Sequence, residues 1–223
     1  MDLGAYHVLE LQIASDPADA RRVMPAIRKD FERILDVGCG AGQTLIASAL
    51  GAHVTAIGID RDFEALKLGR KLDKRIPFVC SRGETLPIRS DYFDLVISRV
   101  ALPYMKTGVA LAEMTRVLRP GGTLWFALHP VEFLAQALAQ SLRSFRVLRS
   151  LRLAYALANG LCAHLTGLEF AAPFTRCRES FQTEKRIVRR LGALGYENIR
   201  VQKKGFFVVT ATRPVKRGDA DIR

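Results

Sequence analysis

The stretch ILDVGCGAGQT, residues 34–44, joins an apolar β-type run to the beginning of a helical pattern. Its glycines at positions 38, 40 and 42 allow a sharp turn, and they let a ligand approach the backbone more closely than a Cβ would permit. Asp60, 18 residues beyond Gly42, ends the next apolar run, where a carboxylate can accept hydrogen bonds from both hydroxyls of a ribose. The pattern predicts a site for an adenosine-containing ligand; the alternative is a tight strand-to-helix turn without a ligand.

Two departures from the dinucleotide-binding fingerprint indicate which adenosine compound is expected. The third glycine of that fingerprint would fall at position 43, which is Gln43, so the spacing is GxGxG. Asp36 lies on the turn, where its negative charge opposes a pyrophosphate but suits an ammonium or sulfonium group. S-adenosylmethionine combines adenosine, an ammonium and a sulfonium, so it is the expected ligand.

From Phe31 onward, apolar β-type runs alternate with helical patterns, which is typical of an α/β fold with a doubly wound parallel sheet. The segment Lys203-Lys204-Gly205 separates two final runs and predicts a hairpin whose last strand is antiparallel. The predicted strands cover residues 34–37, 54–59, 77–80, 93–98, 123–128, 197–202 and 206–212, and the predicted helices begin near residues 44, 62, 109 and 184.

Residues 131 to about 173 form a stretch that such a sheet does not need. They contain no Gly or Pro before Gly160 and are rich in Leu, Ala and Arg, which predicts one or two inserted helices with a break near residues 149–151. We therefore expect one methyl-donor-binding domain from residues 1–130 and 174–223, with residues 1–27 as an N-terminal cap segment. Residues 131–173 would form a helical lid that, with this cap segment, covers an acceptor pocket.

In four segments the chain resembles the class I S-adenosylmethionine-dependent methyltransferases, particularly those that methylate small molecules. The segments are ILDVGCGAG (34–42), GIDRD (58–62), ETLPIRSDYFDLVIS (84–98) and EMTRVLRPGGTLWF (113–126). The resemblance runs from about Phe31 to Leu128 and resumes at Lys185 to Pro214. It implies a Rossmann-like seven-stranded sheet of order 3-2-1-4-5-7-6, with the cofactor over the carboxyl ends of strands one, two and four.

The resemblance also implies the residues that hold the cofactor. Asp36, with the glycine turn (Gly38, Gly40, Gly42), would flank its methionine end, and Asp60 would hold the ribose. Arg61 would lie against one adenine face, Arg82 and Gly83 would meet the adenine edge, and Ser98 and Arg99 would border the methyl group. Arg82 departs from the family, which commonly has an aspartate there; because an arginine cannot accept a hydrogen bond, Glu84 or the Gly83 amide would have to replace it.

A general base is needed only if the acceptor loses a proton. His129, at the end of strand five, and Tyr104 are the main candidates for a catalytic role, followed by His7 and Tyr6. Strand four is followed by Ser98-Arg99-Val100-Ala101 and not by the Asn-Pro-Pro-Tyr or Asp-Pro-Pro-Tyr signature of amino-group methylation. This favours an oxygen, carbon or sulfur acceptor, and we expect an oxygen or carbon atom of a small molecule.

The charge of the chain is concentrated in its C-terminal part. The net charge is +12 over 223 residues; residues 1–130 carry 17 basic and 15 acidic side chains (+2), and residues 131–223 carry 17 and 7 (+10). The arginines of the inserted stretch would face an acidic acceptor, or an anionic membrane that delivers a lipid-like one, or only solvent. An RNA methyltransferase and a non-catalytic S-adenosylmethionine-binding protein are the alternatives, although no separate RNA-binding module is visible.

The cysteines give no reason to expect a metal site. Cys39, Cys80, Cys162 and Cys177 form no CxxC pair and have no zinc-ligand spacing, and the N-terminus shows no signal peptide. We therefore expect no metal and a cytoplasmic location.

Overall fold

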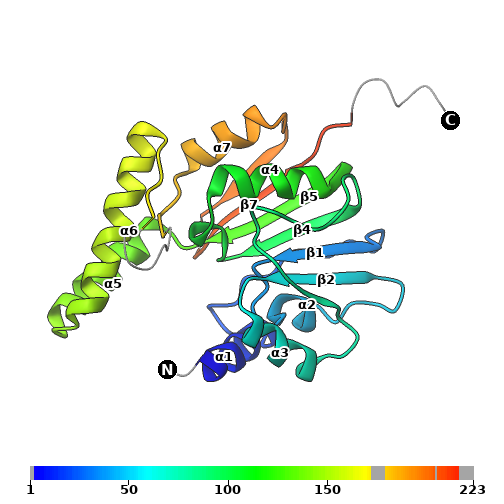
Figure 1. Ribbon diagram of the computed structural model, residues 1–223, viewed down its shortest axis with the longest axis horizontal. Helices are drawn as coiled ribbons and strands as arrows, with labels where there is room; N and C mark the ends of the chain where they lie inside the picture. Colours follow the sequence, from blue (N-terminus) through cyan, green and yellow to red (C-terminus); the bar gives the residue numbers. More distant parts are fainter. Residues whose placement is uncertain (1–2, 172–178, 204, 216–223) are drawn as a thin grey trace.

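A seven-stranded sheet of order β3-β2-β1-β4-β5-β7-β6 forms the centre of the protein, in a computed structural model that describes residues 3–171, 179–203 and 205–215 (Figure 1). All neighbouring strands are parallel except β7, which is antiparallel to both β5 and β6. The predicted strand order and the predicted antiparallel β7 are thus confirmed. The strands are β1 (Arg33–Val37), β2 (Thr55–Asp60), β3 (Phe78–Cys80), β4 (Phe93–Arg99), β5 (Leu118–Leu128), β6 (Ile199–Gln202) and β7 (Phe207–Thr212).

Helices cover both faces of this sheet, and each face has its own apolar core. Met114 of α4 and Ile187 of α7 belong to the core on one face, and Leu45 of α2 and Leu66 of α3 belong to the core on the other. Strand residues alternate between the two cores, as expected for a sheet that is buried on both sides. The helices are α1 (Leu3–Ser15), α2 (Gln43–Ala47), α3 (Phe63–Leu72), η1 (Leu102–Tyr104), α4 (Thr107–Val117), α5 (Val131–Arg143), α6 (Val147–Thr166) and α7 (Glu184–Ala193).

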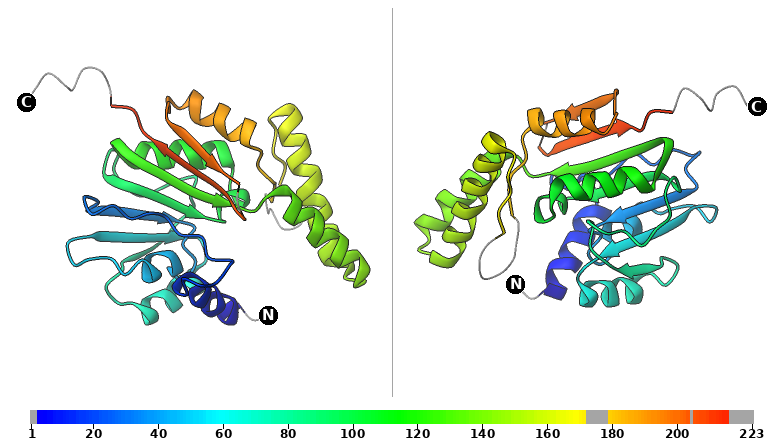
Figure 2. Two further views of the ribbon diagram at one scale, coloured as in Figure 1. Left: turned by 180° about the vertical axis from the view of Figure 1, so that it is seen from behind. Right: turned by 45° about the horizontal axis from the view of Figure 1, so that its top comes forward.

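The inserted stretch forms a helical hairpin, α5 and α6, that stands out from the end of the sheet (Figure 2). The predicted break near residues 149–151 is wrong, because α5 already ends at Arg143 and α6 begins at Val147. Between them Phe145 has a φ of 51°, a left-handed conformation that stops the helix and reverses the chain. The predicted boundary at residues 173/174 lies outside the described residues.

Buried polar contacts fix the base of the hairpin to the rest of the protein. Glu169, just after α6, forms an ion pair with Arg186 of α7 at 2.9 Å, and both side chains are almost fully buried. Asn159 of α6 donates to the carbonyl oxygens of Phe170 and Glu179, each at 3.0 Å. These contacts hold α6 beside α7 although the hairpin is not part of the sheet.

The sheet opens a crevice at the carboxyl end of β1. This strand pairs with β2 on one side and with β4 on the other, so the connections leaving β1 and β4 run to opposite faces. Ligands of doubly wound sheets bind at this kind of position. The glycine turn, Asp60 and Arg99 all lie at the crevice because each immediately follows or ends one of the three strands.

Candidate active site

The glycine turn between β1 and α2 has the backbone conformation that its sequence predicts. Gly38, Gly40 and Gly42 have φ values of 77°, 56° and 79°, which are costly for other residues. A Cβ on Gly38 would lie 2.2 Å from the Cβ of Ala101, and a Cβ on Gly42 would lie 2.7 Å from the ring of Phe78. The lack of a side chain at Gly42 therefore allows the Phe78 ring to pack against the turn. The lack of a side chain at Gly38 allows the loop after β4, at Ala101, to approach the turn closely.

Asp60 fastens this turn to the end of β2. One carboxylate oxygen accepts from the Gly40 amide at 2.8 Å, and the other accepts from the Asp62 amide at 2.9 Å. Each oxygen has a second lone pair, so the side chain can still accept hydrogen bonds from a ligand. Asp62 caps α3 by accepting from the amides of Glu64 and Ala65, at 3.0 and 3.2 Å.

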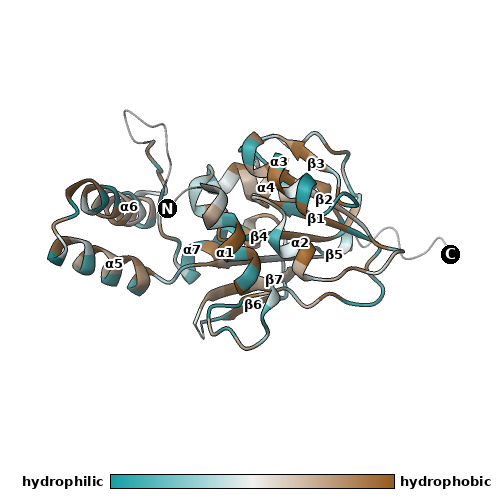
Figure 3. Cartoon of the chain, turned by 90° about the horizontal axis from the view of Figure 1, so that it is seen from below, coloured by the Kyte–Doolittle hydropathy of each residue, from teal (hydrophilic) through white to brown (hydrophobic). Residues whose placement is uncertain are grey.

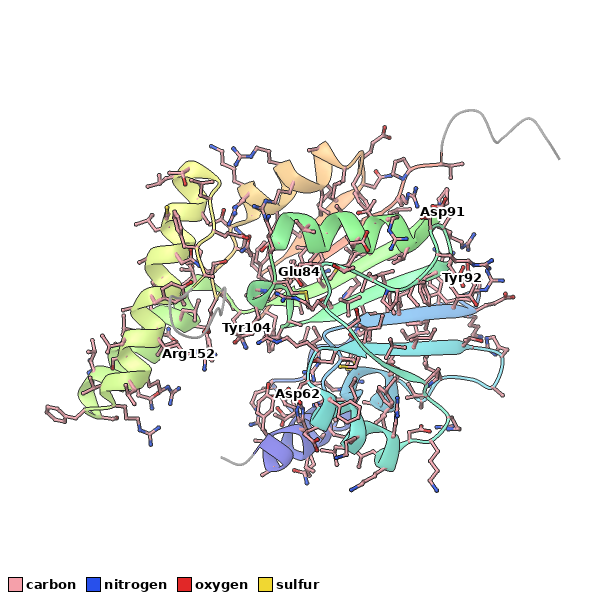
Figure 4. The ribbon with its side chains drawn as sticks, in the orientation of Figure 1. Asp62, Glu84, Asp91, Tyr92, Tyr104 and Arg152 are labelled. Atoms are coloured by element: carbon pink, nitrogen blue, oxygen red, sulfur yellow. The ribbon has the colours of Figure 1, made fainter. Side chains whose placement is uncertain are left out.

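A cavity of about 220 Å³ lies against the turn and the start of α3. Arg61, Arg82 and Gly83 line it together with Asp60 and Glu84. Figure 4 labels three residues that line this cavity: Asp62 after β2, Glu84 after β3, and Tyr104 of η1. Arg82 is mostly exposed, and its Nε lies 3.7 Å from Oε2 of Glu84. Oε1 of Glu84 accepts a hydrogen bond from the Lys106 amide at 2.8 Å.

A second cavity of about 610 Å³ adjoins the first, and the two share Gly38, Gly40, Asp60, Ala101, Tyr104 and His7. Its far wall comes from α1, from the loop after β5 with the start of α5, and from the loop before β7. It includes Tyr6, Glu10, His129, Phe133 and Phe206. The shared lining makes one continuous cleft, with a smaller chamber beside Asp60 and a larger one beside His129.

Helix α1 covers the glycine turn and contributes buried polar groups to the cleft. His7 Nδ1 is 2.8 Å from Nε2 of Gln43, and its Nε2 has no hydrogen-bond partner among the described residues. Glu10 forms an ion pair of 3.0 Å with Arg99, whose Nε donates to the Thr44 hydroxyl at 3.1 Å. Arg99 is therefore held at the wall of the larger chamber.

Asp36 is fully buried behind the turn and does not line either cavity. Neither carboxylate oxygen has a hydrogen-bond partner of normal geometry within the described residues. Burial raises the pKa of Asp36 to about 7, the nearby Asp60 adds to the rise, and the positive charge of Arg99 opposes it. A buried, unpaired carboxyl beside a cleft is suited to a cationic ligand, because a positive charge there would stabilise its ionised form.

The two predicted catalytic residues lie in the same cleft. The His129 ring stacks on Phe133 with centroids 4.5 Å apart, and burial lowers its pKa below the ordinary 6.5. His129 is consequently neutral at neutral pH and able to accept a proton. Tyr104, in η1, lines both chambers, whereas His129 and Tyr6 line only the larger one.

The cleft gathers most of the residues that the sequence singled out. Six of the ten expected cofactor residues line the smaller chamber, and Arg99 lines the larger one. Asp36, Gly42 and Ser98 line neither, and Ser98 is fully buried in β4 with its hydroxyl unpaired among the described residues. The sequence analysis missed Glu10, Met105 and Phe133, because their positions in the chain carry no motif and only the fold brings them to the cleft.

These residues fit S-adenosylmethionine. The left-handed glycines leave backbone open beside the cleft, Asp60 retains acceptor capacity for ribose hydroxyls, and the unpaired Asp36 carboxyl suits a neighbouring cation. Among the described residues, no cluster of three or more His, Cys, Asp or Glu side chains suits a metal ion, and no helix is long and apolar enough to cross a bilayer.

A known family matches the part of the chain that contains the glycine turn and Asp60. Residues 35–126 match the family model described as "Methyltransferase domain". Malonyl-[acyl-carrier protein] O-methyltransferase of Enterobacter lignolyticus is 37% identical over 119 residues, which are 52% of this chain and 45% of that protein. The mitochondrial ubiquinone biosynthesis O-methyltransferase of Rattus norvegicus is 35% identical over 103 residues, 42% of this chain and 29% of that protein. The chain thus spans less than half the length of these relatives.

Solved structures share the fold over most of the chain. An S-adenosylmethionine-dependent methyltransferase from Aquifex aeolicus superimposes with a TM-score of 0.58 and 15% identity, covering 95% of this chain and 98% of that one. Phosphoethanolamine N-methyltransferase 2 of Haemonchus contortus, solved in complex with S-adenosyl-L-methionine, gives a TM-score of 0.58 and 14% identity, covering 85% of this chain and 50% of that one. These solved structures show the fold alone. The match of residues 35–126 to the methyltransferase-domain model, with the strand order and the glycine turn, identifies a class I S-adenosylmethionine-dependent methyltransferase domain.

Proposed function

We propose that this protein transfers a methyl group from S-adenosylmethionine to an oxygen or carbon atom of a small molecule. One observation carries the proposal: the two chambers meet at Gly38, Gly40 and Asp60, so a donor in the smaller chamber and an acceptor in the larger one are neighbours. Fixing two reactants in this way can contribute roughly 7–11 kcal/mol to catalysis.

Within this proposal the chain's own residues bind and orient the donor, which supplies a methyl group already activated on its sulfonium. Asp60 accepts from the ribose, Arg61 lies along the adenine, and Arg82 and Gly83 meet its edge. Gly38 and Gly40 present backbone to the methionine part, with Gly42 and Asp36 supporting the turn from behind. Arg99 faces the larger chamber, and Ser98 supports it from within β4.

The larger chamber suits an acceptor with an apolar body and a polar end. Ile13, Phe133 and Phe206 give it apolar walls, while Arg99 and Glu10 place charges beside the donor chamber. Two of the relatives are named for ubiquinone biosynthesis and for malonyl-[acyl-carrier protein]. A third, from Mycolicibacterium paratuberculosis, is named demethylmenaquinone methyltransferase. It is 33% identical over 97 residues, which are 40% of this chain and 42% of that protein. We infer an acidic or lipid-like acceptor.

Binding and label transfer test the proposal together. Calorimetric titration with S-adenosylmethionine measures the affinity, and methyl-labelled cofactor is then incubated with phenolic, quinol, carboxylic and amine acceptors and with bulk tRNA. We expect label on an oxygen or carbon of a small acceptor. Label on tRNA alone would establish the RNA methyltransferase alternative, and cofactor binding without transfer to any acceptor would favour a non-catalytic binding protein.

His129 is the proposed general base, so its replacement should affect turnover and not cofactor binding. We expect His129→Asn to lower kcat by about 100-fold or more, within the range of general-base catalysis, with an unchanged Kd for S-adenosylmethionine. The wild-type rate should fall as the pH decreases through the pKa of His129, below 6.5, because the protonated ring cannot accept a proton.

Tyr104→Phe provides the comparison for this experiment, since Tyr104 lines both chambers. Suppose that the rate of His129→Asn still falls with decreasing pH as the wild-type rate does, and that Tyr104→Phe is inactive. His129 would then not be the general base, and Tyr104 would take its place in the proposal.

A further inference from the structure

The free end of the α5–α6 hairpin exposes large apolar side chains. Phe145 and Leu148 are 90% and 85% exposed, and three more apolar residues of the same turn and adjoining helix ends are also mostly exposed. We call residues 142–151 the hairpin end; its exposed apolar side chains are Leu142, Phe145, Val147, Leu148 and Leu151. Figure 3 shows that the hairpin stands apart from the sheet, so the described parts of the sheet domain leave this end uncovered.

Hydrogen bonds between the two helices hold the hairpin end together. Ser141 and Ser150 are buried between the two helices, and their hydroxyls lie 3.0 Å apart. Both hydroxyls donate to the carbonyl oxygen of Arg146, at 3.2 and 3.0 Å. Ser150 of the hairpin end and the adjoining Ser141 are therefore buried while Leu and Phe side chains are exposed, the reverse of what a turn surrounded only by water would favour.

Arginines surround these apolar side chains. Arg143, Arg146 and Arg149 are exposed, and none of them forms an ion pair within the part of the chain that the structure describes. Residues 133–168 contain four arginines and no Asp or Glu. Arg152 pairs with Glu179 at 2.6 Å, and Glu132, the acidic residue of α5, lies at the opposite end of that helix. The hairpin end thus combines the positive charge of three exposed arginines with apolar area.

We propose that the hairpin end docks on the surface of an anionic lipid bilayer. Each Lys or Arg near an anionic bilayer contributes about 1 kcal/mol, and Phe or Leu side chains of an amphipathic segment insert at the boundary between headgroups and acyl chains. A second copy of this chain that docked through the same surface would bring arginine against arginine. A nucleic acid would match the arginines but leave five large apolar side chains in water. A bilayer with acidic headgroups accommodates both properties.

The apolar surface continues along the outside of α6. Leu151, Leu161 and Leu165 are spaced so that they lie on one side of a helix with about 3.6 residues per turn, and all three are exposed. At the other end, α5 leads from the hairpin end back to Phe133, which lines the larger chamber. Ten residues of helix separate Phe133 from Arg143, about 15 Å at a rise of roughly 1.5 Å per residue, so docking would bring the chamber close to the bilayer.

Vesicle sedimentation tests the docking independently of the proposed function, because it requires neither cofactor nor acceptor. The wild-type chain is mixed at low salt with vesicles of phosphatidylcholine alone or with added phosphatidylglycerol, and the bound fraction is measured. We expect binding only to the anionic vesicles. Phe145→Ser/Leu148→Ser should weaken it at least tenfold, and Arg143→Gln/Arg146→Gln/Arg149→Gln should weaken it by about 100-fold or more.

Leu72→Ser is the matched control, because Leu72 is an exposed leucine at the end of α3 in the sheet domain. It should bind vesicles as the wild type does, and all variants should keep the wild-type Tm because the altered side chains are exposed. Equal binding to neutral and anionic vesicles, or wild-type binding by both hairpin variants, would overturn the proposal. So would dimerisation of the wild type in solution that the Phe145→Ser/Leu148→Ser change abolishes while vesicle binding persists.

Discussion

Asp60→Ala is expected to lower the affinity for S-adenosylmethionine by at least about 100-fold. Its carboxylate would accept hydrogen bonds from the ribose, and hydrogen bonds to a charged group contribute roughly 1.5–3 kcal/mol each. The same side chain holds the Gly40 amide at 2.8 Å, so the substitution also releases the glycine turn that faces the methionine part. Calorimetric titration of both proteins with S-adenosylmethionine measures the change.

Glu64→Ala serves as the control for this titration. Glu64 is an acid only four residues away, but it lies on the exposed side of α3, where it pairs with Lys67 at 3.0 Å. It should bind the cofactor with the wild-type affinity, because an exposed ion pair of this kind contributes little. Equal affinities of Asp60→Ala and the wild type would remove Asp60 from the binding site while leaving the family assignment of the domain intact.

Asp36→Asn is expected to make the ligand-free protein less sensitive to pH and to weaken cofactor binding. Burial raises the pKa of Asp36 from 3.8 to about 7, so the folded protein holds a proton that the unfolded chain releases. The contribution of Asp36 to the free energy of unfolding therefore falls as the pH rises from about 4 to 7. Between pH 5 and pH 8 this loss is about 3 kcal/mol in order of magnitude, and the asparagine variant should not show it.

Cofactor binding should have the opposite pH dependence. The cationic groups of S-adenosylmethionine favour the ionised carboxylate, so the wild-type affinity should increase as the pH rises through about 7, with release of a proton. The affinity of Asp36→Asn should be lower at pH 8, by about tenfold or more, and should stay flat across this range. Urea unfolding at several pH values and titrations at pH 6 and 8 measure the two effects; parallel stability profiles for both proteins would contradict the assignment of the raised pKa to Asp36.

Much of the sheet could be predicted from local sequence. The apolar runs, the glycine turn and the charged or Gly-rich breaks between them depend on backbone conformation and burial within a few residues. This turn needs left-handed backbone at positions 38, 40 and 42, so the glycines at these positions predicted it without knowledge of any tertiary contact. The same holds for Asp62, whose side chain caps the helix that follows it.

Other parts of the site could not be read in this way. Helix α1 has no regular apolar period, yet it brings His7 and Glu10 against the turn and pairs Glu10 with Arg99, which lies 89 residues later. The side chain of Ser98 is buried in the core, whereas that of its neighbour Arg99 reaches the cleft. The register of β4 between β1 and β5 determines which of the two side chains faces the cleft. The position of the break between α5 and α6 could not be predicted, because it is set by the left-handed backbone conformation of Phe145 within a sequence whose pattern is helical throughout.

The sequence by itself determined the apolar runs, the glycine turn and the acidic residue at the end of β2, because these follow from short-range propensities and one well-defined turn. The strand order was predicted only through the resemblance to the class I methyltransferases, because it depends on which distant strands pair. Only the tertiary structure decided that α1 covers the glycine turn, that the Asp36 carboxyl is fully buried and that the hairpin end exposes its apolar side chains. Burial, ion pairing across distant segments and pKa shifts depend on which surfaces meet, and that information exists only once the chain has folded.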